Sequence, residues 1–487
     1  MPDRPNILVL LTDQLRPFEL SCHGHPVVKT PNIDRLAAGG VRFEYACTSN
    51  PVCTPARSSV ISGQYSRTCT GMLGCVGDPA SRRCHFPDTT LAERLQTAGY
   101  DAALVGKWHI GPSPRIVGFA ETVYPKVHHL NQNQLYFDGT GHSWVQEGFC
   151  PDFEVQTTQQ FLRRRRERPF FLFHNLCLPH MPYFDVPDRY RRRYRPEDVL
   201  LRPNTTIGGK LYYDENAFLI YYYDHLYYRE HRPDMQTLPD GYDLHALTAH
   251  YCGMIASVDE QVGQILDTLA DAGLAENTIV LFTSDHGDNL GSQHLWNKIS
   301  VNDEAIRIPF IVSWPGTLRP GVVREHVASL VDVAPTLLSL AVGAGHCCPP
   351  ACGAGGGRGV RTCPPSSVPA FMQGRDLSPI LRGEAARIGI GEAIIENLRG
   401  ELAIRTPSHL YAVMTETQHG TPLRKLTDDR FMFYDTRIDP YEMTNLAKTG
   451  EQQDVARDLR DRILTWDRET PWMPGTLGGT YGQGPER

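Results

Sequence analysis

The chain has 487 residues, of which 41% are hydrophobic and 21% charged, a composition typical of a soluble protein with a sizeable buried core. Its formal net charge of -7 gives no general attraction to nucleic acid or to anionic membranes, so neither is an expected partner. The 13 cysteines follow no regular spacing, which predicts reduced thiols rather than a disulfide framework.

The first predicted element is a core strand from Asn6 to Leu11. This apolar run is too short to span a membrane, and no small-residue cleavage site follows it. It ends instead at the polar sequence Thr12-Asp13-Gln14. Without a visible export signal or membrane span, the expected location is the cytoplasm.

Further along the chain, apolar runs of strand length alternate with segments of helical period, which predicts an α/β architecture. The later strands are expected at residues 102–105, 170–176, 278–283 and 310–314. Helices are expected at residues 91–98, 258–269 and 332–341. A last amphipathic helix is expected to place Val455, Leu459 and Ile463 on one face.

The pattern changes beyond about Gly374, where the segments become shorter and more polar. We therefore expect a main α/β domain over residues 1–374. A smaller C-terminal subdomain, with antiparallel strands and a terminal helix, is expected over residues 375–487.

Two segments do not fit this pattern. The glycine-, cysteine- and proline-rich segment Gly343–Pro364 is interpreted as a flexible surface loop. Its potential zinc ligands follow no common spacing; they are Cys347, Cys348, Cys352, Cys363 and the neighbouring His346. The tyrosine-rich segment Lys210–Asp234 is either an aromatic wall for a substrate or an insertion packed on the domain, and packing is slightly favoured.

Clusters of polar side chains follow four of the predicted strands. The clusters are Asp13-Gln14, Gly106-Lys107-Trp108-His109, Pro179-His180 and Ser284-Asp285-His286-Gly287. In open α/β sheets the carboxyl ends of the strands line one crevice, so these clusters can converge. Together they supply the carboxylates, histidines and lysine expected of a metal site that also binds an anion.

Asp13, Asp285 and His286 are candidate metal ligands, and the amide oxygen of Gln14 completes the set. Donors rich in oxygen favour a hard divalent cation such as calcium, magnesium or manganese. Each pair taken alone is also consistent with ordinary turn or helix-cap chemistry.

The segment from Asn50 to Gly63 carries a candidate reactive cysteine. Pro55 stands where a helix can begin and Gly63 where it can end. Cys53 then lies at or before the positive end of that helix, with Arg57 about one turn further in, an arrangement that suits an anionic substrate. The alternatives are a buried structural cysteine and a conventional thiol nucleophile, although the latter leaves the metal ligands without a purpose.

Cys53-Thr-Pro-Ala-Arg57 resembles the signature of the type I sulfatases, in the alkaline phosphatase superfamily. Further similar pieces occur in order along the chain: Pro5-Asn-Ile-Leu, Thr30-Pro-Asn-Ile-Asp34, Gly106-Lys-Trp-His109, Pro179-His180-Met-Pro-Tyr183, Ser284-Asp-His-Gly287, Leu295-Trp-Asn-Lys298, Tyr434-Asp435, Asp439-Pro440 and Thr444-Asn445-Leu446. Gln64 departs from the arginine that more often closes the signature, and Gln14 replaces the second aspartate of many members.

The resemblance implies a large mixed sheet sandwiched by helices, with a smaller C-terminal α+β subdomain. It also implies that a formylglycine-generating enzyme oxidises Cys53 to formylglycine. The implied ligands of one divalent metal, usually calcium, are Asp13, Gln14, residue 53, Asp285 and His286. The implied catalytic residues are Cys53, Arg57, Lys107, His109, His180 and Lys298.

In the implied reaction, the chain is a sulfatase that hydrolyses a sulfate monoester, and a sulfated sugar is the first expectation for the substrate. A hydroxyl of hydrated formylglycine attacks sulfur and gives a formylglycine-sulfate intermediate, while Lys107, His180 and Lys298 hold the sulfate or the leaving oxygen. His109 then takes a proton from the second hydroxyl and sulfate is expelled.

Two other functions remain open from the sequence. Phosphonate monoester and phosphodiester hydrolases share the scaffold and the formylglycine, but tend to carry tyrosine and threonine where Lys107 and His109 stand. A non-catalytic binder of sulfated glycans would keep Cys53 unmodified. Specificity is expected from loops such as Gln132 to Phe149 and from the tyrosine-rich segment, and the oligomeric state is not predicted.

Overall fold

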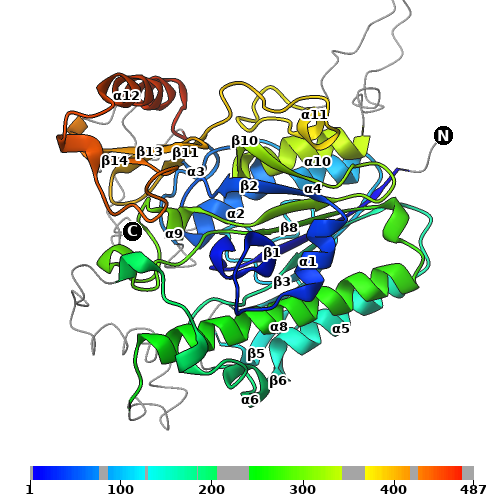
Figure 1. Ribbon diagram of the computed structural model, residues 1–487. Coiled ribbons are helices and arrows are strands. Elements are labelled where there is room, and N and C mark those ends of the chain that lie inside the picture. The colour runs from blue at the N-terminus through cyan, green and yellow to red at the C-terminus, as the bar shows by residue number, and fades with distance from the viewer. Residues whose placement is uncertain are drawn as a thin grey trace, which may run out of the picture.

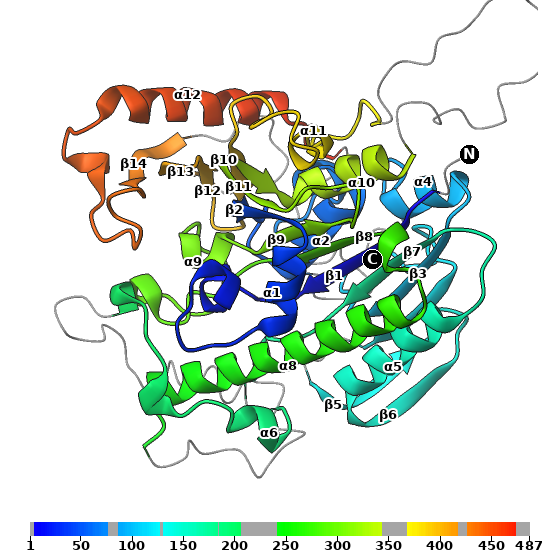
Figure 2. The same cartoon turned by 45° about the vertical axis from the view of Figure 1, so that its right-hand side comes forward.

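A computed structural model describes residues 4–75, 86–126, 130–183, 185–205, 241–342, 368–416 and 426–473. The segments Gly343–Pro364 and Lys210–Asp234 both lie outside these residues, so their predicted roles stay predictions. Within the described residues, ten strands form one sheet and four form another. Figures 1 and 2 show the large sheet between layers of helices, with the small sheet and a long helix packed at one end.

The large sheet is mixed, as predicted, and has the strand order β10-β2-β9-β8-β1-β7-β3-β4-β5-β6. Its strands are β1 (Asn6–Thr12), β2 (Val41–Cys47), β3 (Asp101–Gly106), β4 (Glu121–Pro125), β5 (Gln132–Phe137), β6 (Ser143–Phe149), β7 (Phe170–Asn175), β8 (Thr278–Ser284), β9 (Phe310–Ser313) and β10 (Gly321–Ser329). The central strands β8, β1, β7 and β3 run parallel to one another. Their carboxyl ends therefore lie on one edge of the sheet.

The alternation of side chains along β1 explains why helices cover both faces. Ile7, Val9 and Leu11 belong to the core under one helical layer, whereas Leu8 and Leu10 belong to the core under the other. Successive side chains of a strand point to opposite faces, so a continuous apolar run predicts burial on both. β1 is completely buried, in agreement with that prediction.

The helices in the described residues are α1 (Pro31–Ala38), α2 (Cys53–Ser62), α3 (Ser66–Cys69), α4 (Leu91–Thr97), α5 (Cys150–Arg163), α6 (Asp188–Arg191), α8 (Leu244–Asp271), α9 (Asp303–Ile306), α10 (Val333–Val342), α11 (Ser378–Leu381) and α12 (Gln453–Glu469). Short 3-10 turns are η1 (Pro17–Glu19), η2 (Ser21–His23), η4 (Pro196–Asp198), η5 (Pro203–Thr205), η7 (Ala275–Asn277), η8 (Ser292–His294), η9 (Leu330–Asp332) and η10 (Leu446–Lys448). None of the described helices has the length and apolarity that a membrane crossing requires.

Two expectations about local structure need correction. The helix predicted at residues 258–269 begins much earlier, at Leu244, because most residues of its first half are buried and show little polar periodicity. The segment from Gln132 to Phe149, expected as a loop, is an antiparallel hairpin of β5 and β6 at the edge of the sheet.

The C-terminal part forms the predicted α+β unit. Its sheet has the order β11-β12-β13-β14, with β11 (Ala393–Glu396), β12 (Glu401–Arg405), β13 (His409–Thr415) and β14 (Leu426–Asp435) all antiparallel. Leu459 and Ile463 of α12 are buried against it, but Val455 is exposed, so the predicted apolar face is shorter than expected. The boundary at residue 374 stays a prediction.

Buried ion pairs join the C-terminal unit to α3 of the main domain. Arg67 of α3 contacts Glu396 at 2.7 Å and Asp467 at 2.6 Å, and its guanidinium lies over the rings of Trp466 and Trp472. Removing one partner of such a buried pair leaves an uncompensated charge, which is strongly destabilising. These contacts therefore fix the C-terminal unit against α3.

The buried carboxyl group of Glu154 on α5 makes the stability of the large domain depend on pH. Glu154 accepts a hydrogen bond of 2.7 Å from the hydroxyl of Tyr136. Burial nevertheless raises the pKa of Glu154 to about 8, because the low-dielectric surroundings disfavour the carboxylate. Between the ordinary pKa of 4.5 and about 8, the folded protein therefore binds a proton that the unfolded chain does not.

We expect the substitution Glu154→Gln to flatten this part of the stability profile. The proton at Glu154 makes the unfolding free energy of the wild type fall by at most about 1.4 kcal/mol per pH unit as the pH rises through this window. Glutamine keeps an acceptor oxygen for Tyr136 and cannot ionise. Between pH 5 and 9, the melting temperature of Glu154→Gln should rise relative to that of the wild type as the pH increases. The control Glu147→Gln, at an exposed position, should show no such pH-dependent change. If the melting temperatures of Glu154→Gln and the wild type differ by the same amount at pH 5 and at pH 9, Glu154 is not the source of the pH dependence.

Candidate active site

The register of the central strands brings the predicted clusters together. Thr12 pairs with Ser284 across β1 and β8, so the next residues, Asp13 and Asp285, emerge side by side. The amide of Asp285 donates to the carbonyl of Thr12 at 3.1 Å. Parallel strands in register therefore place two carboxylates from distant parts of the sequence at one point of the sheet edge.

Helix α2 delivers Cys53 to this edge. The helix begins at Cys53 itself, two residues earlier than Pro55 suggested, and ends at Gly63 in a left-handed conformation (φ 68°), as predicted. All its residues are buried, and the hydroxyls of Ser58 and Ser62 are satisfied by carbonyls one turn earlier, at 2.7 Å. Cys53 thus lies at the positive end of a buried helix dipole.

Arg57 ties the two carboxylates to α2. Its Nε donates to Asp285 Oδ2 at 2.9 Å and its second terminal nitrogen to Asp13 Oδ2 at 3.1 Å. The remaining terminal nitrogen donates to the carbonyl of Lys107 at 3.1 Å. Arg57 is fully buried, so its planar guanidinium fixes the ends of β1, β8 and β3 relative to one another.

Lys107 reaches Asp13 because β3 ends in a glycine. Gly106 has a φ of 87°, and a Cβ there would lie 2.1 Å from the carbonyl oxygen of Asn175. That carbonyl accepts the amide of Lys107 at 3.0 Å. The Lys107 ammonium forms a close ion pair with Asp13 Oδ2 and lies 3.9 Å from the sulfur of Cys53.

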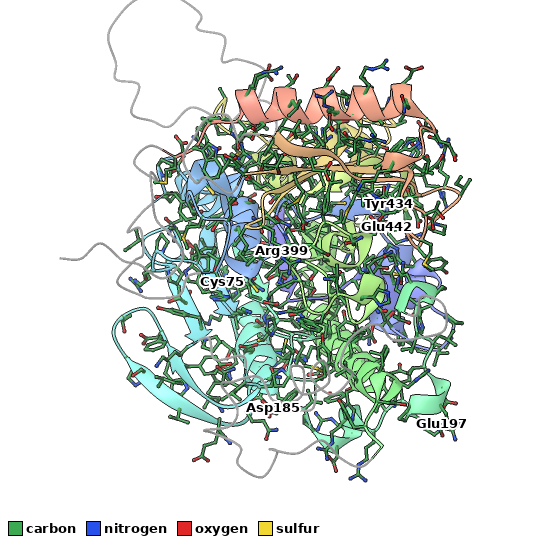
Figure 3. All side chains as sticks on the ribbon, turned by 90° about the vertical axis from the view of Figure 1, so that its left-hand side faces the viewer. Cys75, Asp185, Glu197, Arg399, Tyr434 and Glu442 are labelled. Atoms are coloured by element: carbon green, nitrogen blue, oxygen red, sulfur yellow. The ribbon has the colours of Figure 1, made fainter. Side chains whose placement is uncertain are left out.

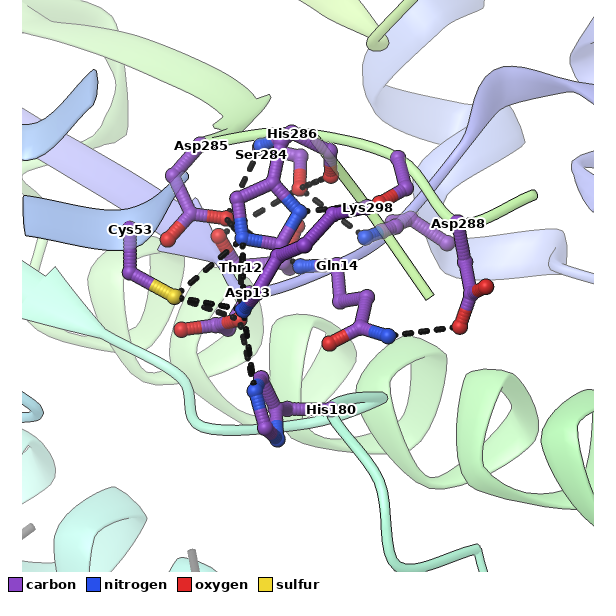
Figure 4. A network of polar contacts seen from close by, with 12 residues as sticks. Thr12, Asp13, Gln14, Cys53, His180, Ser284, Asp285, His286, Asp288 and Lys298 are labelled. Carbon is purple, nitrogen blue, oxygen red and sulfur yellow. Dashed lines mark hydrogen bonds and ion pairs between the residues drawn. The ribbon is translucent and has the colours of Figure 1, made fainter. Parts of the chain in front are cut away.

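Lys298 and two histidines surround the same sulfur (Figure 4). Lys298 Nζ is 2.9 Å from Cys53 Sγ, 3.1 Å from His180 Nε2 and 3.2 Å from His286 Nε2. The Nδ1 atoms of both histidines face backbone carbonyls, at 2.6 Å for His180 and 2.8 Å for His286. A carbonyl only accepts, so Nδ1 carries hydrogen in each ring and Nε2 faces the site.

His109 and Cys75 lie on another side of Cys53. A sulfur or ring-nitrogen atom from each of the three residues lies within 4.8 Å of the others. The thiol of Cys75 hydrogen-bonds to the Cys53 sulfur, and this bond, with burial, raises the pKa of Cys75 well above its usual range. His109 is held to α2 because Thr54 Oγ1 donates to its carbonyl at 2.9 Å.

The site stabilises negative charge on the residues that face it. Although burial opposes ionisation, nearby cations led by Lys107 hold the pKa of Asp13 well below its usual range. The hydrogen bond from Cys75 and the charges of Lys107 and Lys298 likewise outweigh burial and lower the pKa of Cys53. Burial and Lys298 lower the pKa of His180 to about 3, so Lys298, rather than His180, is the cation on this side.

The residues present also fit a divalent metal. Asp13, Cys53, Asp285 and His286 each offer a ligand atom, and all four atoms lie within 4.8 Å of one another. Gln14 donates through Nε2 to Asp288 at 2.5 Å and to Asn297 at 3.1 Å. Its Oε1 is buried without a hydrogen-bond partner and is turned toward Asp13 (Figure 4). A hard cation would satisfy this oxygen.

All the candidate residues from the sequence come together in this region. Cys75, Asp288 and Asn297 are additional members that the sequence did not indicate. Asp288 follows His286 by two residues, so its place directly after the Ser284–Gly287 cluster was a usable signal. Cys75 and Asn297 lie in irregular segments with no periodicity, and only the structure reveals them.

A sequence model of the family described as Sulfatase matches residues 5–344. The chain belongs to the sulfatase family. It is 29% identical over 507 residues to an arylsulfatase of Clostridium perfringens, covering 95% of this chain and 94% of the relative. An ulvan-active sulfatase of Formosa agariphila is 28% identical over 479 residues, covering 95% of this chain and 81% of the relative.

Solved structures show the same fold. One of them, a protein in complex with its substrate D-glucosamine-2-N,6-O-disulfate, aligns with a TM-score of 0.75 at 21% identity, covering 96% of this chain and 98% of that one. This sulfatase is therefore a sulfuric ester hydrolase with an alkaline phosphatase-like fold, in agreement with the expectation from the sequence.

Proposed function

We propose that this sulfatase removes sulfate from a sulfated carbohydrate, using a formylglycine formed from Cys53 and a calcium ion. The observation that carries the proposal is the surroundings of the Cys53 sulfur: Lys298 at 2.9 Å, His286 at 3.2 Å and Asp13 at 3.7 Å. A thiol at the start of a helix, between metal-ligating groups and lysines, stands where a nucleophile and an anionic group must meet. The sulfated-sugar substrate follows from the activities named for the ulvan-active relative and the complexed structure.

Asp13, Gln14, Asp285, His286 and the side chain at position 53 would hold the metal. The calcium ion would supply positive charge to the sulfate oxygens and to the nucleophile. A formylglycine would supply a hydrated aldehyde, one hydroxyl of which attacks sulfur while the other remains for release of the product. Its formation makes a formylglycine-generating enzyme the expected maturation partner.

The residues of the chain have distinct roles in this proposal. Lys107 and Lys298 neutralise the sulfate oxygens, and Lys298 also donates to the oxygen of the leaving alcohol. His180 Nε2 accepts a hydrogen bond from Lys298 at 3.1 Å, which orients that ammonium. Arg57 stays buried and keeps Asp13 and Asp285 ionised for the metal.

His109 is the proposed base for release of the product. Its ring hydrogen-bonds to the Cys53 side chain, and burial lowers the pKa of His109, so the imidazole is neutral and can accept a proton from a hydroxyl at position 53. Loss of that proton favours expulsion of sulfate and restores the aldehyde.

The substitution Cys53→Ala should abolish turnover because it removes the precursor of the nucleophile, and the fold should be retained. In the active wild type, mass spectrometry of the peptide containing residue 53 should show a loss of about 18 Da relative to cysteine, as oxidation to an aldehyde requires. Cys252→Ala, at another buried cysteine, should keep its activity. Full activity of Cys53→Ala, or unmodified cysteine in a fully active preparation, rejects the mechanism.

Gln14→Met tests the metal site. Methionine has a similar length but removes the partnerless oxygen, so calcium affinity measured by calorimetry should fall at least about tenfold, as losses around metal sites typically do. Gln64→Met is the matched control, since Gln64 is also buried, with an unpaired Oε1, but bonds Asp88 and Phe371. Equal calcium affinities of the two variants exclude Gln14 as a ligand.

Relative rates on different esters separate sulfatase from phosphonate monoester or phosphodiester activity. We expect turnover of aryl sulfate to exceed that of the matching aryl phosphonate and phosphodiester, because Lys107 and His109 occupy positions where those enzymes tend to carry tyrosine and threonine. A panel of sulfated mono- and disaccharides beside aryl and alkyl sulfates then identifies the substrate class. Faster phosphonate hydrolysis reverses the assignment, and binding of sulfated sugars without turnover in the metal-loaded protein indicates a binder.

A further inference from the structure

The loop that carries Lys298 has an unusual backbone. Asn297 has a φ of 58° and Ile299 a φ of 87°, so residues on both sides of the lysine are left-handed. A branched side chain such as that of isoleucine disfavours this conformation strongly, and such residues persist only where their surroundings fix them. The position of Lys298 therefore depends on what holds its two neighbours.

The neighbour preceding Lys298 is held from within the main domain. The carbonyl of Asn297 accepts from the Asn289 amide at 2.6 Å and from its side chain at 2.9 Å. The Asn297 side chain also accepts from Gln14 at 3.1 Å. This half of the loop is thus fixed by residues next to the metal ligands.

The neighbour following Lys298 is held from two other directions. The amide of Ile299 donates to the carbonyl of Pro51 at 3.2 Å, in the segment leading to Cys53. The carbonyl of Ile299 accepts a short hydrogen bond from Nδ2 of Asn397, which belongs to the C-terminal subdomain. Both polar groups of the strained residue are therefore engaged.

Asn397 is itself rigidly placed. It is fully buried in the turn between β11 and β12, where its Oδ1 accepts the amides of Arg399 at 3.0 Å and Glu401 at 3.1 Å. Its Nδ2 also donates to Glu401 Oε2 at 2.7 Å. Arg399, labelled in Figure 3, is the exposed residue of the same turn.

The same turn is attached to the segment that precedes Cys53. The amide of Glu396, at the end of β11, donates to the carbonyl of Ser49 at 3.1 Å. One turn of the small sheet thus contacts both the approach to Cys53 and the peptide that follows Lys298. The distance between the sulfur and the ammonium, 2.9 Å, is set in part from outside the main domain.

We propose that Asn397, supported by Glu401, is a positioning residue that holds Lys298 against the reacting group. The proposal rests on the role of Lys298 at the leaving oxygen given above. Without the Asn397 hydrogen bond, Ile299 relaxes from its left-handed conformation and moves the lysine away from that oxygen. The C-terminal subdomain then contributes to the rate as well as to stability.

The variant Asn397→Ala should lower kcat by about 10- to 100-fold, the effect of a displacement on the order of 1 Å in a catalytic group, with a smaller change in KM. The loss should grow along a series of substituted phenyl sulfates from 4-nitrophenyl to unsubstituted phenyl, because poorer leaving groups need Lys298 more. In a Lys298→Ala background, Asn397→Ala should not lower kcat any further, since the two residues act as one unit.

Asn445→Ala is the matched control. Asn445 also bridges backbone groups of the subdomain, donating to the Phe431 carbonyl at 2.9 Å and accepting the Phe433 amide at 3.1 Å. It should lower the melting temperature without changing the leaving-group dependence. If Asn397→Ala does not fold, Glu401→Gln provides the test, because it weakens the support of Asn397 while keeping an acceptor; its smaller loss of kcat should follow the same trend.

The possible results separate the two hypotheses. An inactive wild type, or a Lys298→Ala protein as fast as the wild type, rejects the proposed function or the role of Lys298. The positioning role alone is overturned if the wild type behaves as expected but Asn397→Ala lowers kcat equally for all leaving groups. It is also overturned if the effects of Asn397→Ala and Lys298→Ala on kcat are additive.

Discussion

The structure depends on two carboxylates buried side by side. Asp13 and Asp285 follow paired strands, and neither has exposed surface, so their mutual repulsion must be balanced within the protein. Arg57 contacts both, and Lys107 pairs with Asp13. Burial and the neighbouring Asp13 still raise the pKa of Asp285 to about 6, which shows that the balance is incomplete. A further positive charge beside the carboxylates, and an anion beside the lysines, would therefore both be electrostatically favourable.

This constraint explains several features of the fold at once. Arg57 can bridge the two strand ends only if α2 points its first turn at the sheet edge, and the buried serines of α2 allow the helix to be covered on all sides. Gly106 is required because the chain must turn sharply there to bring Lys107 to Asp13. Cys53 then lies at the first position of α2, next to the cations that neutralise Asp13. The position of Cys53 is thus a consequence of how the carboxylates are buried.

Much of this arrangement could be predicted from the sequence because it rests on regular elements. The apolar runs of β1, β3, β7 and β8 and the polar clusters after them indicate one crevice, and the Cys53-to-Arg57 spacing indicates the helix start. The hairpin of β5 and β6 was not predicted, because few of its residues are buried and neither strand carries a clear apolar run. Cys75 lies in an irregular segment and Asn397 in a turn, where neither hydrophobic periodicity nor residue propensity predicts which distant residue is contacted.

The small sheet forms hydrogen bonds with segments next to Cys53 and Lys298, in addition to packing beside the large sheet. The family match ends at residue 344, yet the end of β11 and the turn that follows it hydrogen-bond to Ser49 and Ile299, which lie close to Cys53 and Lys298 in the sequence. The crevice at the edge of a parallel sheet is open by nature, since only strand ends and loops line it. A second sheet packed across one side supplies rigid backbone where a loop alone would be mobile. The strained Ile299 shows why this support is needed: a left-handed isoleucine beside a buried lysine persists only if both of its peptide groups are held, and one of the holding groups belongs to the C-terminal sheet.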